Sequence, residues 1–194
     1  MTRTALGITA FVIAAVLVGA AALTMAGSRY ISGNVHDQLV VQDISFAPAG
    51  SPGLPADIQS YGGTAVTNGA QAKVFADQYI AAHVAGSIAD AAKTDPRLAG
   101  ITTYSQLSSL ARSDPKGKDL TGLIDSVFKG QMLRSSLLSA WGWGTMATIM
   151  FWVALSGFGA AVLLGLAGAL LVPVVASRLG LSRLARLAPR PAAG

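Results

Sequence analysis

Two histidines with nearby carboxylates are the residues of this 194-residue chain best suited to chemistry. His36 is followed by Asp37, and His83 comes shortly after Asp77. Two imidazoles and a carboxylate can hold zinc, copper or non-haem iron if the fold brings them together. Neither histidine belongs to an H-x-x-x-H or H-x-E pattern, so ordinary surface or hydrogen-bonded histidines are the stronger interpretation. We predict no metal and no cofactor, and keep these four residues as weak metal candidates.

The sequence carries no other catalytic pattern. It has no cysteine, which excludes disulfides, thiolate metal sites and cysteine nucleophiles together. It also lacks a phosphate-binding loop, a serine triad motif, a paired-carboxylate motif and a haem-binding pattern. We therefore expect a protein that is not an enzyme.

Composition and charge place the chain at a membrane. Hydrophobic residues make up 52% of it and charged residues 12%, with a mean hydropathy of +0.54. The acidic and basic residues between the two apolar segments balance, so the net charge of +5 resides in the two ends. That distribution indicates membrane orientation rather than nucleic-acid binding, which needs clustered basic residues. The orienting residues are Arg3, Arg178, Arg183, Arg186 and Arg190.

The first apolar segment, Ala5 to Gly27, contains no charge and is long enough to cross a hydrocarbon core of roughly 30 Å. A signal peptide is the competing interpretation, because Thr24-Met25-Ala26 resembles a cleavage site. The apolar run is longer than the core of a signal peptide, which favours an uncleaved anchor.

The second apolar segment, Ser135 to Ser177, would measure about 65 Å as one helix. It contains either one span that projects beyond the bilayer or a hairpin of two spans turning at residues 156–159. Positive flanks stay in the cytoplasm, and both ends of the chain are positive. We therefore predict one span, about Trp143 to Val172, with both termini cytoplasmic and residues 29–140 outside the cytoplasmic membrane.

The polar middle predicts a small helical cap. The first helix should continue past the membrane to about Val40, and the prolines of residues 47–55 should then form a connection. Apolar spacing predicts a helix over residues 71–92, and Thr103 to Gln106 matches a capping box that starts a short helix ending near residue 112.

A stripe at i, i+3, i+4, i+7 and i+8 then predicts an amphipathic helix that continues into the second span, giving one helix of roughly fifty residues. Its members are Leu120, Leu123, Ile124, Val127 and Phe128. The predicted fold is an all-α membrane protein with two transmembrane helices and a helical extracytoplasmic cap. The expected parts are an anchor (1–28), a loop domain (29–134), a second transmembrane helix (135–177) and a basic tail (178–194).

Several runs resemble a family of small actinobacterial membrane proteins, among them residues 35–46, 73–83, 103–107, 128–134 and 140–144. The resemblance covers most of residues 30–150 and implies two spans around an external loop. Some members carry an aromatic ring-opening dioxygenase label. The present chain shows no iron-binding pattern that supports such an activity, so the resemblance contributes no catalytic residues.

Three surfaces are candidates for binding. Trp141 and Trp143, with Arg134, match an interfacial belt that anchors a helix at the head-group level. Small residues let a second helix approach closely, either another subunit or this chain's own first helix. They recur at every fourth position as Gly157, Ala161, Gly165 and Ala169. The arginines and leucines of the tail suggest a helix lying on an anionic leaflet, or a tail that only orients the span.

Neither span contains Asp, Glu, Lys, Arg or His, which argues against a channel, pump or carrier. The leading hypothesis is an accessory, structural or assembly subunit of a larger bacterial membrane complex, of a respiratory or membrane-oxidase kind. Its expected partners are the lipid bilayer and other membrane subunits, bound through the second span and the cap, and no nucleic acid. The alternative is an extracytoplasmic ligand- or metal-binding or sensing module.

Overall fold

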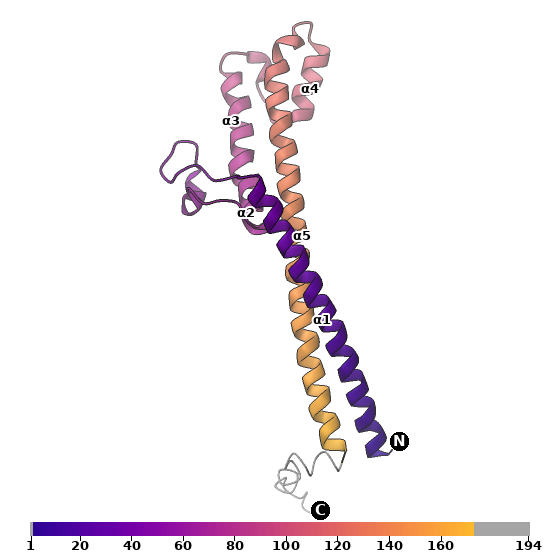
Figure 1. The fold of residues 1–194 in the computed structure, drawn as a ribbon. Helices are drawn as coiled ribbons and strands as arrows, with labels where there is room; N and C mark the ends of the chain where they lie inside the picture. The colour runs from indigo at the N-terminus through magenta and orange to yellow at the C-terminus, as the bar shows by residue number, and fades with distance from the viewer. Residues whose placement is uncertain (1, 173–194) are drawn as a thin grey trace, which may run out of the picture. The chain divides into compact units, whose positions relative to one another are not determined.

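A computed structural model describes residues 2–172 of the chain, and throughout this part the regular elements are helices (Figure 1). The two long ones are α1 (Arg3–Val41) and α5 (Thr121–Leu171), and both are long and apolar enough to cross a membrane. The chain divides into two compact units, Tyr30–Ala147 and Met1–Arg29 with Thr148–Gly194. The boundaries predicted from the sequence, after residues 28, 134 and 177, stay a prediction.

The helix α1 continues beyond its apolar segment, as its sequence predicts, and ends just before a residue in the left-handed conformation. Asp43 has a φ of +49°, the left-handed conformation that commonly follows a helix C-terminus. The amides of Gln42 and Asp43 donate to the carbonyls of Leu39 and Val40. These bonds pair carbonyls that the helix end leaves without a partner.

Residues 44–80 form the first half of the unit that spans residues 30–147. Ser45 and Ala65 make an isolated antiparallel bridge, and the short helix η1 (Ala56–Tyr61) lies between them in the chain. Asn68 then caps α2 (Gly69–Val74) by accepting a bond from the Gln71 amide. One turn of π-helix, η2 (Phe75–Ile80), follows directly. The predicted helix over residues 71–92 therefore starts slightly earlier and contains a wider turn.

The second half contains α3 (Ala81–Ala92), η3 (Pro96–Leu98), α4 (Tyr104–Ser113) and η4 (Gly117–Leu120), which leads into α5. The capping box at Thr103 and Gln106 is present as the sequence predicts, with both reciprocal bonds formed. The single long helix is also confirmed, since α5 contains 51 residues. The apolar stripe predicts burial correctly for Leu120 and Val127, but Phe128 is 45% exposed, and its ring lies 5.6 Å from that of Tyr104 at an angle of 46°.

This unit has two hydrophobic clusters. The first joins α1, α2, η2 and α5 around Leu39, Phe46, Phe75 and Leu137, and Phe46 meets the Phe75 ring edge-on at 4.9 Å between centroids. The second joins α3, α4 and α5 around Ile88, Leu98, Leu107 and Val127. Aromatic and branched side chains therefore fill both clusters, as in a soluble domain.

The unit formed by residues 2–29 and 148–172 has the opposite pattern, with small residues inside and large ones outside. Its buried residues include Ala14, Ala21, Ala154 and Ala161, while Leu23 and Leu163 are 77% and 70% exposed. The two helix segments run antiparallel, because Gly7 approaches Gly168 and Ala21 approaches Gly157. Close approach of two backbones requires such small residues at the contact.

Candidate functional site

The histidines singled out by the sequence take part in separate local bonds. His36 Nδ1 lies 3.0 Å from the Thr67 carbonyl oxygen, and His83 Nδ1 lies 2.8 Å from the Tyr79 carbonyl oxygen. A ring nitrogen can meet a carbonyl only as an N–H donor, so in the neutral form of each ring Nε2 is the acceptor. Residues 2–172 contain no group of three or more His, Asp or Glu placed to hold a metal ion. The weak candidates His36, Asp37, Asp77 and His83 are therefore not brought together.

Asp77, in η2, instead pairs with two cationic side chains, those of Lys73 in α2 and Arg134 in α5. Lys73 Nζ lies 2.5 Å from Asp77 Oδ2, and Arg134 Nη2 lies 3.3 Å from Asp77 Oδ1. The hydrogen bond from Lys73, followed by that from Arg134, holds the pKa of Asp77 below its usual value despite partial burial, which acts in the opposite direction.

Arg134, which the sequence predicts as an interfacial anchor, has partners within the protein. Its Nε donates to the carbonyl oxygen of Ala76 at 2.9 Å, and its side chain is only 27% exposed. That carbonyl also accepts from the Ala81 amide across the π-turn. Arg134 thus ties α5 to η2, and its role as an interfacial anchor stays a prediction.

The two tryptophans are exposed, as an interfacial position requires. Trp141 is 38% exposed and Trp143 is 56% exposed. The Lys73 ammonium lies 4.8 Å from the centroid of the Trp141 ring, a cation–π distance. Trp141 therefore has a protein contact as well as an exposed edge, and a lipid-interface role for both rings stays a prediction.

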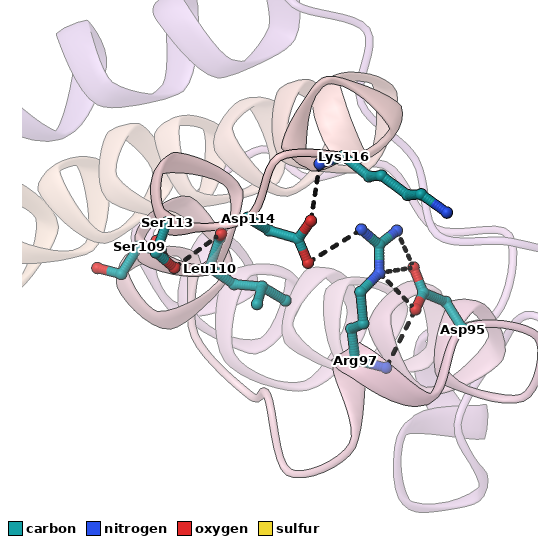
Figure 2. A network of polar contacts seen from close by, with 7 residues as sticks. All are labelled: Asp95, Arg97, Ser109, Leu110, Ser113, Asp114 and Lys116. Atoms are coloured by element: carbon teal, nitrogen blue, oxygen red, sulfur yellow. Dashed lines mark hydrogen bonds and ion pairs between the residues drawn. The ribbon is translucent and has the colours of Figure 1, made fainter.

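A second polar network, at the far end of α4, was missed by the sequence interpretation. Arg97 donates from Nε and Nη2 to the two oxygens of Asp95, at 2.9 and 2.6 Å, and its Nη1 pairs with Asp114 Oδ2 at 3.2 Å (Figure 2). Each aspartate also accepts from the amide two residues on, in Arg97 and Lys116. The repeated Asp-Pro-basic tripeptide, at 95–97 and 114–116, is the signal that predicts this pair of turns.

This network should make the stability of the cap depend on pH. Arg97 holds the pKa of Asp95 below its usual value, and the Lys116 amide and then Arg97 do the same for Asp114. A carboxylate with a lowered folded-state pKa stabilises the fold above the unfolded value of about 3.9, and this contribution is lost as pH falls through the folded-state pKa. We expect the unfolding temperature of the unit of residues 30–147 to decrease when the pH is lowered below about 4. Ellipticity of the protein in detergent measures this temperature.

The variant Asp95→Asn/Asp114→Asn should have a lower unfolding temperature than the wild type at pH 6. Its unfolding temperature should also change less between pH 6 and pH 3. Asp119→Asn, an exposed aspartate outside the network, is the matched control and should keep the full dependence. Equal pH profiles for the double variant and the control would contradict this role of the network.

The small-residue face of the second span meets this chain's own first helix along part of its length. A Cβ on Gly157 would lie 3.1 Å from the Ala21 Cβ, and Ala161 is 3% exposed. A Cβ on Gly165, in contrast, would meet no atom within 4 Å, and Ala169 is buried. The predicted four-residue row is thus only partly a packing face.

A seven-residue spacing describes the contact better. Buried small residues recur on α1 at Gly7, Ala14, Ala21 and Ser28, and on α5 at Ala154, Ala161 and Gly168. An interval of seven residues keeps a position on the same side of two helices that wind around each other, whereas an interval of four drifts around the helix. This repeat in the sequence is the signal that identifies the contact.

Arg3 is exposed at the start of α1, whereas Arg178, Arg183, Arg186 and Arg190 lie outside the described residues. Their role in orientation stays a prediction. No family model, no curated protein and no solved structure matches the chain.

Proposed function

We propose that the protein crosses the cytoplasmic membrane twice, through α1 and α5, with both termini inside. The observation that supports this proposal is the inverted packing of residues 2–29 and 148–172. Large side chains such as Val16, Leu23 and Leu166 are more than half exposed, while alanines and glycines are buried. In water this arrangement would expose apolar surface that a soluble protein buries, whereas in lipid it is the expected one.

The proposed role is that of an accessory, structural or assembly subunit of a larger membrane complex, of a respiratory or membrane-oxidase kind. Neither apolar segment contains an ionisable residue with which to move ions or protons. The charged clusters at Asp77 and at Arg97 are engaged in holding helices together. The outer, lipid-facing side of the helix pair and the surface of the cap are then the regions available to other subunits.

Purification of the tagged full-length protein in mild detergent, after cross-linking in cells, tests this role. A discrete set of membrane proteins should co-purify at fixed ratios, and an unrelated two-span protein carrying the same tag should not recover them. Recovery of a monomer alone, even after cross-linking, would contradict the proposal.

The orientation has its own test, because the chain contains no cysteine and single ones can be introduced. A cysteine at the exposed Ser105 should react with an impermeant maleimide in intact cells, and one at Ser182 should react only after lysis. The reverse pattern would refute the proposed topology without bearing on the partners.

One observation favours the alternative, an extracytoplasmic ligand- or metal-binding module. His83 borders a hollow of about 330 Å³ that Gly53, Ser87 and Asp90 also line, and its Nε2 lies 3.6 Å from the position of a Cβ on Gly53. Because Nδ1 is bonded to Tyr79, Nε2 is the acceptor available to a ligand. Elemental analysis of the purified protein and of the His36→Ala/His83→Ala variant decides: absence of metal from both removes the metal version.

A further inference from the structure

A groove of about 380 Å³ lies between the C-terminal part of α1 and the middle of α5, within the unit of residues 30–147. Its volume is within the range of small-molecule sites. No lining residue is ionisable, and the groove combines hydroxyl and amide side chains with an apolar floor. The polar side chains are those of Gln38, Gln42, Ser135, Ser136 and Ser139.

The serines of the groove differ from those helical serines that pair with their own helix, and resemble the exposed helical serines Ser32, Ser105 and Ser156. Ser87, Ser113 and Ser126 each donate their hydroxyl to a carbonyl of the preceding turn, which satisfies the donor locally. Within residues 2–172, the side chains of Ser135, Ser136, Ser139 and Gln38 make no hydrogen bond to the protein. All four are exposed, so their donors and acceptors are available to a ligand.

The apolar parts of the groove give it a floor and two ends. Leu39 and Leu137 are almost completely buried beneath it. Met132 and Trp143, both more than half exposed, line it from positions about 16 Å apart along α5. The predicted span begins at about Trp143, within the uncharged segment that starts at Ser135, so an amphiphile with its head in the groove would direct its chains along the predicted span.

The polar groups indicate the class of head group. A hydroxyl and a carboxamide each donate and accept, and so match the hydroxyls of a sugar or polyol, which do the same. A phosphate only accepts and is usually held by Arg or Lys. The basic residue nearest in the chain, Arg134, is already engaged by Asp77 and the Ala76 carbonyl.

We infer that the groove binds the uncharged, hydroxyl-rich head group of a membrane glycolipid, with the Trp143 ring beside the boundary between sugar and acyl chains. The inference goes beyond the accessory role and rests on the proposed membrane location. It assigns residues 38–42 and 132–143 a lipid-binding function that is independent of any protein partner.

Lipid retention by the full-length protein tests the inference. The protein is placed in phosphatidylcholine nanodiscs doped with one probe at a time, and bound lipid is measured by native mass spectrometry. The probes are glucosyl-diacylglycerol, diacylglycerol with the same chains, phosphatidylglycerol, and soluble methyl glucoside. We expect glucosyl-diacylglycerol to be retained about tenfold better than either lipid control, in keeping with several uncharged hydrogen bonds.

Substitution of the three serines locates the binding site. Ser135→Ala/Ser136→Ala/Ser139→Ala should weaken glucosyl-diacylglycerol retention about tenfold, while alanine at exposed helix positions preserves the fold. Ser126→Ala, on the same helix but outside the groove, is the matched control and should bind like the wild type. Gln38→Ala is an independent variant from the other wall and should also weaken binding.

The outcomes separate the inference from the proposed location. Failure of the protein to enter nanodiscs contradicts the membrane location and the lipid inference together. Entry without discrimination between the lipids, preference for phosphatidylglycerol, or equal binding by the triple variant overturns the lipid inference alone. Binding of methyl glucoside as tight as that of the glycolipid overturns the assignment to a lipid and leaves a soluble sugar as the ligand.

Discussion

Gly117→Ala should destabilise the unit of residues 30–147 more than most single substitutions in this chain do. Gly117 is buried at the start of η4, and a Cβ there would overlap the Ala111 carbonyl oxygen and lie 2.6 Å from its carbonyl carbon. These are backbone atoms, so no side-chain rotation relieves the overlap. Because overpacking costs about 1–3 kcal/mol where side chains can adjust, we expect a loss at or above the upper end of that range.

Amide hydrogen exchange over residues 104–113, in detergent at constant pH, measures this loss as a lower free energy of opening. Gly122→Ala is the matched control, because a Cβ there meets nothing within 4 Å and alanine is favoured over glycine inside a helix. Protection should fall for the first variant and stay equal or rise for the second. Unchanged protection in Gly117→Ala would show that the contact between α4 and η4 differs from the one described.

Ala161→Leu should separate the paired segments of α1 and α5. Ala161 is 3% exposed in a row of small residues, and the added atoms have no space at the contact without an outward shift of one helix. The adjacent Ala160 is exposed, so Ala160→Leu adds the same atoms to the outer surface. We expect a loss of about 1–3 kcal/mol for the first variant and little change for the second.

An engineered disulfide reports on this packing directly. Ala21→Cys and Gly157→Cys would place two Cβ atoms close to the separation of about 3.5–4.5 Å that a disulfide needs, because a Cβ on Gly157 lies 3.1 Å from that of Ala21. Oxidation should join them rapidly in the parent and in Ala160→Leu, and slowly in Ala161→Leu. Equal rates in all three would mean that this face of α5 does not pack on α1.

The regular elements were largely predictable because their signals are local. The capping box at Thr103 and Gln106 joins groups three residues apart, and the continuity of α5 follows from the absence of any breaker between Leu120 and the apolar segment. The length and lack of charge of two segments likewise predicted two helices able to cross a membrane. Each of these signals is complete within a few turns of chain.

The partners of individual side chains were decided only by the tertiary structure. Arg134 binds Asp77 and the Ala76 carbonyl because a π-turn places that carbonyl next to α5, and nothing near Arg134 in the sequence indicates it. Arg97 joins two turns that are far apart in the chain. Side-chain pairing across such separations depends on how helices pack, which periodicity does not specify.

The contact between the paired segments of α1 and α5 shows what the sequence and the tertiary structure each contributed. The sequence by itself determined that small residues would allow close approach, and it contains the seven-residue repeat that marks the contact. Only the tertiary structure decided that α1 covers Gly157, that Ala161 is buried and that Gly165 stays open. The physical reason is that residue size permits a contact, whereas the relative winding of two helices selects which of the permitted positions meet.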